Sequence, residues 1–324
     1  MKRSIIQYLP LVLIFALSAF AGGQPSDDCP SDDAEFAKVR QRAADGQPSA
    51  QAALASCYDL GHHVQPSRAE NIRWLTEAAE QGYAPAEYEL GRIYLYGHGV
   101  PSDYSKALVW ERKAAEQGDP RAQRDLAFMY ERGFGVNADP EQAAAWNRKA
   151  ATQGEPNAQL RLAQALEGGA GVRVNPDEAR RWYAAAAKQQ QSRAQLHLAR
   201  IYAEKANCSL AVHWYKEAAA GGEPQAMYEL GKLYLQENCG ENRVQAFQWF
   251  SIGARFGLPE SKIEAGKLTP HLSPAQKKTA ELQVERWIAS GRLSERNGLS
   301  EDGTLIDPFK FARCYPMRRA INGN

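Results

Sequence analysis

The chain has 324 residues, of which 44% are hydrophobic and 24% charged, and its formal net charge is +1. This composition is typical of a folded globular protein and excludes a disordered or collagen-like chain. The near-neutral charge argues against a nucleic-acid partner, because no basic excess is available to neutralise phosphates.

The N-terminal segment has the three parts of a secretory signal peptide. Lys2 and Arg3 precede an apolar run that is densest over residues 11–17, and Ala19-Phe20-Ala21 supplies the small residues that signal peptidase reads. The apolar run is short for a membrane-spanning helix, although an uncleaved anchor is the alternative. We expect residues 1–21 to be removed by cleavage after Ala21, which leaves a periplasmic protein with no membrane span.

A second segment, residues 22–49, is expected to be a linker followed by an N-terminal capping helix. The stretch Asp32–Asp45 has the apolar spacing of one amphipathic helix. The chain beyond it is periodic, and this periodicity is the main signal in the sequence. Tryptophan recurs at 74, 110, 146, 182, 214, 249 and 287, and leucine recurs in phase with it at 54, 90, 126, 162, 198 and 230. A fixed period of this length predicts a solenoid of stacked units.

One unit shows what each repeat contains. Over residues 86–94 the apolar side chains step by three and four, which predicts a helix with one apolar face. The segment Gly97-His98-Gly99-Val100-Pro101 then breaks that helix, and Asp103 can cap a second one that carries Trp110 and Ala114. Neither helix can bury its apolar face alone, so each unit depends on its neighbours.

The motifs Leu90-Gly91-x-x-Tyr94-x-x-Gly97-x-Gly99-Val100, Asp103-x-x-Lys106-Ala107-x-x-Trp110 and Lys113-Ala114-Ala115-Glu116-Gln117-Gly118 resemble the Sel-one-like repeat, a relative of the tetratricopeptide repeat. The resemblance implies an all-α fold, a right-handed α/α solenoid of about six helix-turn-helix repeats with capping helices. We place the repeats at residues 50–258, a degenerate capping repeat at 259–291 and a non-repeat tail at 292–324. In one repeat Leu166 stands where the others have tyrosine.

Cysteine positions predict two disulfides in an oxidising compartment. Cys208 and Cys239 lie in the two irregular inter-helix segments of consecutive repeats, where the Gly-x-Gly-Val turn is missing. Cys29 precedes the capping helix and Cys57 lies in the helix against which that cap should pack. Cys314 is then left over in the tail.

No catalytic motif stands out, and we expect no enzyme activity, cofactor or metal. The sequence contains no Gly-x-Ser-x-Gly, phosphate-binding glycine loop, His-Glu-x-x-His or Ser-x-x-Lys. His62, His63 and His98 occupy equivalent turns of adjacent repeats and are the one cluster that a metal could share, but histidine in a solvated turn explains them better.

The resemblance therefore favours a scaffold that binds a protein or peptide in the bacterial envelope. Two alternatives are a β-lactam-binding or β-lactam-hydrolysing enzyme, as in cysteine-rich exported relatives, and a factor that binds cell wall or polysaccharide. In tetratricopeptide-like units the first helices line the concave groove, and aromatic and arginine side chains are enriched at interfaces. The groove positions hold Tyr88, Arg92, Tyr96, Arg124, Phe128, Arg132, Gln164, Arg200, Tyr228 and Lys232.

Overall fold

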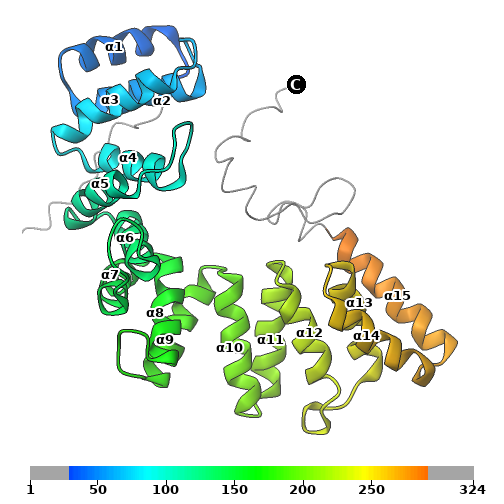
Figure 1. The fold of residues 1–324 in the computed structure, drawn as a ribbon. Coiled ribbons are helices and arrows are strands. Elements are labelled where there is room, and N and C mark those ends of the chain that lie inside the picture. Colours follow the sequence, from blue (N-terminus) through cyan, green and yellow to red (C-terminus); the bar gives the residue numbers. More distant parts are fainter. Residues whose placement is uncertain (1–28, 291–324) are drawn as a thin grey trace, which may run out of the picture. The chain divides into compact units, whose positions relative to one another are not determined.

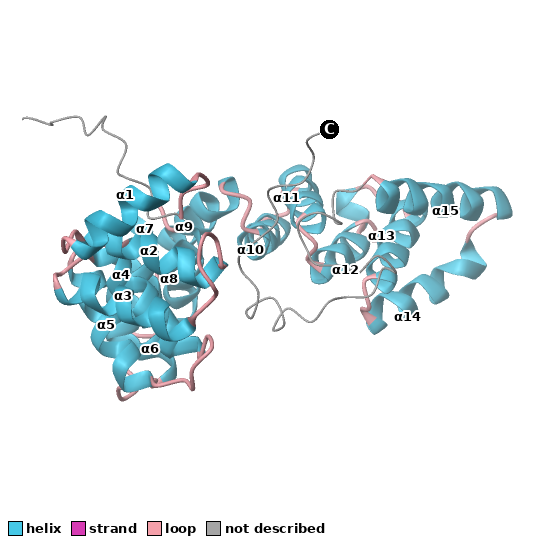
Figure 2. Cartoon of the chain, turned by 90° about the horizontal axis from the view of Figure 1, so that it is seen from above, coloured by secondary structure: helices cyan, strands magenta, loops and turns pink. Residues whose placement is uncertain are grey.

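A computed structural model describes residues 29–290, and this part of the chain consists of helices and loops without a strand (Figures 1 and 2). The expected all-α solenoid is confirmed. The signal sequence with Ala21 and the tail with Cys314 lie outside the described residues. Between residues 29 and 290 no helix is long and apolar enough to cross a membrane.

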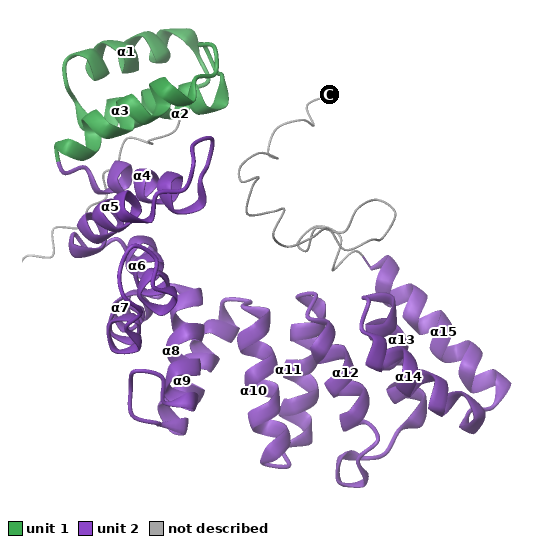
Figure 3. Cartoon of the chain, in the orientation of Figure 1, with its two compact units in different colours: residues 1–81 green, residues 82–324 purple. Residues whose placement is uncertain are grey.

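The chain divides into two compact units, residues 1–81 and 82–324 (Figure 3). The described part of the first unit holds α1 (Asp33–Ala44), α2 (Pro48–Leu60) and α3 (Arg68–Glu80). The described part of the second unit holds α4 (Ala84–Tyr96), α5 (Tyr104–Glu116), α6 (Pro120–Arg132), α7 (Pro140–Thr152), α8 (Pro156–Gly168), α9 (Pro176–Lys188), α10 (Ser192–Glu204), α11 (Cys208–Ala220), α12 (Pro224–Leu233), the 3₁₀ turn η1 (Glu237–Cys239), α13 (Arg243–Arg255), α14 (Pro259–Leu268), the 3₁₀ turn η2 (Thr269–His271) and α15 (Pro274–Ala289).

The repeated leucines and alanines form the core of each unit. The six repeating leucines, at 54, 90, 126, 162, 198 and 230, are each at most 2% exposed. The alanine four residues after the tryptophan is fully buried in each of the first five repeats. First helices such as α4 end at a glycine in the left-handed conformation, Gly97 with φ +69°, because a residue without Cβ adopts this angle at no steric cost.

The tryptophans are less buried than the repeating leucines and alanines. Only Trp249 is fully buried, and the other six are partly exposed. Basic side chains cover three of the exposed ring faces: Lys149 Nζ lies 3.5 Å from the centroid of Trp146, Lys113 covers Trp110 and Arg73 covers Trp74. Each tryptophan therefore contributes apolar bulk while its outer face is shielded by a cation–π contact.

A ladder of glutamines joins the helix ends of neighbouring repeats. Gln123 donates to the Ala115 carbonyl at 3.1 Å and accepts from Gln153 at 2.9 Å. The same pair of bonds recurs one repeat later at Gln159 and Gln189. Since Gln123 and Gln159 are buried, these bonds satisfy amide groups that would be costly to leave without a partner. Glu87 takes the glutamine's place in one repeat, where it still accepts from Gln117 at 2.7 Å but has no amide N–H to donate.

We expect Glu87→Gln to stabilise the protein at neutral pH. Glu87 is 2% exposed, and burial raises the pKa of its carboxyl, so its charged form is disfavoured in the folded state. Removal of that charge should raise the free energy of unfolding by about 1 kcal/mol, measured by urea denaturation. The reverse change Gln123→Glu is the matched control and should be destabilising; a Glu87→Gln protein less stable than wild type would contradict this account.

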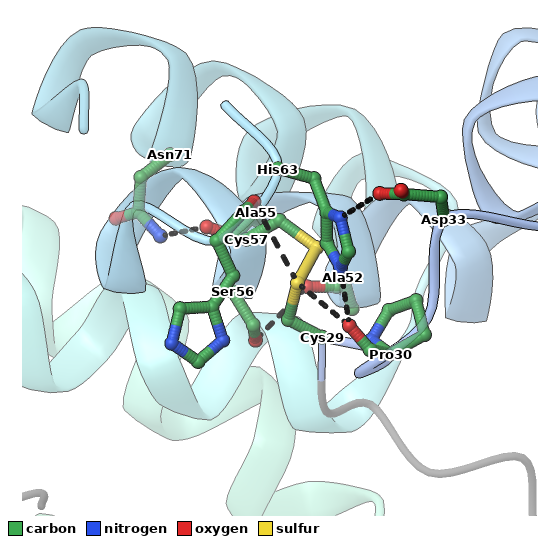
Figure 4. The surroundings of a disulfide bond; sticks show 10 residues. Cys29, Pro30, Asp33, Ala52, Ala55, Ser56, Cys57, His63 and Asn71 are labelled. Carbon is green, nitrogen blue, oxygen red and sulfur yellow. Dashed lines mark hydrogen bonds and ion pairs between the residues drawn. A yellow bond between two sulfur atoms is a disulfide. The ribbon is translucent and has the colours of Figure 1, made fainter. Parts of the chain in front are cut away.

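The N-terminal cap is fastened by a disulfide and a histidine (Figure 4). Cys29 and Cys57 are bonded, with their Cα atoms 4.8 Å apart, as expected from the sequence. His63 lies beside them, with Nδ1 2.7 Å from Asp33 Oδ1, Nε2 2.9 Å from the Pro30 carbonyl oxygen, and its ring stacked on Phe36. The hydrogen bond to Pro30 and then that to Asp33 raise the pKa of His63, because two acceptors favour the doubly protonated ring. His63 is thus a structural clamp on residues 30–36.

His63 can hold residues 30–36 because of its position within the repeat. It has φ +62° and corresponds to Gly135 and Gly171, which have φ +69° and +70°. A Cβ at Gly135 would collide with the backbone of Tyr104, in the second helix of the preceding repeat. Since no repeat precedes the first one, the side chain at position 63 has room to reach the cap.

The second predicted disulfide is also present. Cys208 and Cys239 are bonded, with their Cα atoms 5.4 Å apart. Cys208 is the first residue of α11 rather than part of the connecting loop, because Asn207 caps the helix immediately before it. The bond ties the start of α11 to η1 and so fixes the segment that lacks the glycine turn.

Replacement of both Cys208 and Cys239 by serine is expected to lower the free energy of unfolding by about 2–4 kcal/mol, because the unfolded chain loses a cross-link. Urea denaturation with and without reductant measures this, and the reductant should have a smaller effect on the variant than on wild type. Alkylation of Cys208 in unreduced protein would overturn the pairing.

Candidate functional site

The predicted groove residues lie on the first helices of the repeats in the second unit. In three places an aromatic ring and a cation from one helix contact each other: Arg92 lies 5.7 Å from the ring of Tyr88, Arg132 lies 5.7 Å from that of Phe128, and Lys232 lies 5.5 Å from that of Tyr228. Arg200 on α10 and Lys232 on α12 both face the carboxylate of Glu229, at 3.4 and 3.9 Å. Gln164 lies partly buried on α8. The strongest convergence is at α4–α6.

The α4–α6 site, as we call it, contains Tyr88, Arg92 and Tyr96 of α4, Glu111 of α5, and Arg124, Asp125 and Arg132 of α6. Arg124 is its centre: Nε donates to Asp125 Oδ1 at 2.8 Å, Nη1 lies 3.2 Å from Glu155 Oε1, and Nη2 donates to the Tyr88 hydroxyl at 3.4 Å. Asp125 is 3% exposed, so this ion pair is largely removed from water.

Tyr88 does not face an open groove, which corrects the sequence prediction. Tyr88 is only 4% exposed. The guanidinium carbon of Arg121 lies 4.3 Å from the centroid of its ring, and Arg124 donates a hydrogen bond to its hydroxyl. Burial, followed by the charge of Asp125, raises the pKa of Tyr88 to about 12, so the hydroxyl stays protonated at neutral pH. Tyr88 is therefore a buried part of the site that positions Arg124 and Arg121.

The feature that the sequence prediction missed is Glu111. It is fully buried, and neither of its carboxyl oxygens accepts a hydrogen bond from the residues between 29 and 290. It lies tightly against α4, since a Cβ at Gly91 would be 2.6 Å from Glu111 Oε1. A carboxyl in this position is costly in its charged form.

The repeat frame could have revealed Glu111. The residue after the tryptophan is buried in every repeat, and it is Leu75, Glu111, Asn147, Tyr183, Tyr215 and Phe250 in turn. We call these six equivalent positions the column, and Glu111 is the one acidic residue in it. Tyr183 shows how the column accommodates polarity, since its hydroxyl donates to Glu167 Oε2 at 2.7 Å.

Two buried carboxyls thus share one environment with two arginines. Burial and then the charge of Asp125 raise the pKa of Glu111 well above its usual range. Burial also raises the pKa of Asp125, although Arg124 and Arg92 oppose this. We infer that the Glu111 carboxyl is protonated, whereas the Asp125 carboxyl, which is paired with Arg124, is charged.

The outer part of the site is open to solvent. The Arg92 side chain is 32% exposed and lies 3.6 Å from Glu89, and Tyr96 is 44% exposed at the end of α4. Arg132 is exposed at the end of α6. Arginine and tyrosine side chains are common anchors of protein interfaces, so Arg92, Tyr96 and Arg132 beside the buried polar groups suit contact with a protein surface.

His63 is held in structural contacts. Both ring nitrogens of His63 are engaged by Asp33 and Pro30, and no group of three or more His, Cys, Asp or Glu side chains within residues 29–290 is arranged to hold a metal ion.

Comparison with known proteins agrees with this architecture. Six consecutive segments match the Sel1 repeat, at residues 48–83, 84–119, 120–155, 156–190, 192–223 and 224–255. The chain belongs to the Sel1 repeat family. A crystal structure of a Sel1 repeat protein from Oxalobacter formigenes is 30% identical, with 73% of this chain and 70% of that chain covered and a TM-score of 0.62. A protective antigen from uropathogenic Escherichia coli, described as having an SLR fold, is 23% identical over 88% of this chain and 83% of that chain, with a TM-score of 0.43. None of the curated proteins matches.

We expect Glu111→Leu to stabilise the Sel1 repeat array and to reduce the dependence of its stability on pH. Because the folded-state pKa of Glu111 is raised, its favourable contribution is complete below about pH 4.5, the usual carboxyl pKa, and is lost as pH rises through the folded-state value. At neutral pH the variant should gain about 1–4 kcal/mol, and the gain should shrink toward pH 4.5.

Thermal and urea unfolding over this pH range measure the effect. The control is Asn147→Leu, the same column position one repeat later, whose effect should not vary with pH. A Glu111→Leu effect that is equally independent of pH would show that Glu111 does not titrate in this range.

Proposed function

We propose that this Sel1 repeat protein is a non-catalytic scaffold of the bacterial periplasm that binds a protein partner through the α4–α6 site. The observation that carries the proposal is the partly exposed Arg92 and the exposed Tyr96 and Arg132 toward the ends of two neighbouring first helices, supported by Arg124 in its ion pair with the buried Asp125. Rigid support matters because anchors that are already ordered lose less entropy on binding.

Export is supported by the signal-like residues 1–21 and by the two disulfides, since disulfides persist in the periplasm and are rare in the cytosol. A scaffold role is supported by family membership, since Sel1 repeats are typical of protein–protein interaction modules. The packing of the repeat is consistent with this role, because the leucine, alanine and glutamine positions serve the fold and leave the first-helix faces for recognition.

The combined change Arg92, Tyr96 and Arg132 to alanine is expected to abolish partner recovery without loss of helicity. Single changes should each weaken binding by about 1–3 kcal/mol, in the range of interface hot spots. Crosslinking pull-down from the native periplasm, compared with circular dichroism of the same proteins, measures both properties.

A matched control carries three alanine changes at exposed residues of second helices, Val109, Lys188 and Lys216. It should recover the partner as wild type does. Equal recovery by both triple variants would remove the α4–α6 site as the binding surface, and loss of helicity in the first would show that its residues serve packing.

A further inference from the structure

The fourth repeat, residues 156–190, lacks a tyrosine that both neighbouring repeats have. In the third repeat the hydroxyl of Tyr130 on α6 accepts a hydrogen bond from Arg112 Nη2 of α5 at 2.9 Å. The corresponding residues 36 positions later are Leu166 on α8 and Arg148 on α7. Without the tyrosine hydroxyl, Arg148 forms an ion pair with Glu178 of α9 instead.

The fourth repeat also lacks a second aromatic contact of the third repeat. Phe134 stacks on Tyr104 with their ring centroids 4.4 Å apart. The equivalent positions in the next repeat hold Ala170 and Pro140, which have no rings. The fourth repeat is therefore poorer in aromatic side chains than the third, and of the replaced positions Leu166 is the one that lines the pocket described next.

The structure has a pocket at this point. Its volume is about 490 Å³, and it is lined by Arg148, Leu166, Val172, Arg173, Val174, Asn175 and Glu178. Leu166 is 2% exposed whereas Val174 is 53% exposed, so the pocket reaches from the repeat core to the surface. We call it the Leu166 pocket.

The polar groups of the Leu166 pocket suit a hydroxyl. Arg148 can donate, and Glu178 can accept, whereas a hydroxyl can do both. The hydrogen bond from Arg148 lowers the pKa of Glu178, which keeps it a carboxylate at neutral pH. The side chains of Leu166, Val172 and Val174 offer apolar contact to a ring.

We propose that the Leu166 pocket binds a phenolic ring, which takes the place that Tyr130 occupies in the preceding repeat. The ring packs on Leu166 and the two valines, and its hydroxyl accepts from Arg148 and donates to Glu178. Such a ring is the side chain of a tyrosine on a bound polypeptide or a free phenolic compound. This inference is independent of the α4–α6 site, which lies on other helices.

The test is titration of the full chain with p-cresol, followed by NMR of the methyl groups of Leu166, Val172 and Val174. We expect saturable shifts at these methyls, and about tenfold weaker binding of toluene, because toluene leaves the polar pair without a hydroxyl. N-acetyl-tyrosinamide distinguishes the sources: competition with p-cresol indicates a tyrosine side chain, and failure to compete indicates a free phenol.

Two variants make the test specific. Leu166→Tyr fills the pocket from within and should abolish the p-cresol shifts. Arg148→Met keeps the pocket empty and removes the donor, so it should weaken p-cresol to the level of toluene. The proposal is overturned if wild type shows no saturable shifts, if toluene binds as well as p-cresol, or if Arg148→Met leaves the affinity unchanged.

Discussion

The close approach of two helices within each repeat is the constraint on which the rest of the structure depends. In each repeat, the residue that follows the tryptophan of the second helix packs against the residue that follows the repeating leucine of the first helix. A Cβ at Gly91 or at Gly231 would lie 2.6 Å from the side chain of Glu111 or of Phe250. Only glycine or alanine occupies the first-helix position in the six repeats, which is why the pattern recurs so regularly. Because each helix pair is fixed in this way, the side chains beside it occupy equivalent positions from one repeat to the next.

A regular frame makes exceptions informative. Glu111 places a carboxyl in a column of apolar and uncharged polar residues, and Leu166 removes a ring that neighbouring repeats retain. Both break a local rule without an evident gain in packing, and sequences that do so often serve function at that position. The first exception underlies the α4–α6 site, and the second opens the Leu166 pocket. His63 is a third exception with a structural outcome, because it replaces a glycine only where no preceding repeat stands in its way.

Much of the fold could be predicted from the sequence because its signals are periodic. The tryptophan and leucine series gave the helix pairs, and the two disulfides followed from where cysteines fall in that frame. The candidate site was predicted less well. Helical register placed Tyr88 on the first-helix face, but register does not show that Arg121 and Arg124 of the next helix cover it. Glu111 belongs to no sequence motif, and only its place in the buried series that follows each tryptophan distinguishes it from an ordinary helix-surface glutamate. Leu166 departs visibly from the tyrosine series, whereas the pocket beside it depends on the ion pair between Arg148 and Glu178 of the next helix, which the sequence does not show.

The central claim is that the repeats share one packing frame and that a buried acid at Glu111 weakens it locally. Native-state hydrogen exchange resolved to single amides tests this most directly, through protection factors in α5–α6 and in α7–α8 at about pH 5 and about pH 8. The account predicts that protection in α5–α6 falls between the two pH values while protection in α7–α8 stays the same. Equal protection of both helix pairs at both pH values would contradict it.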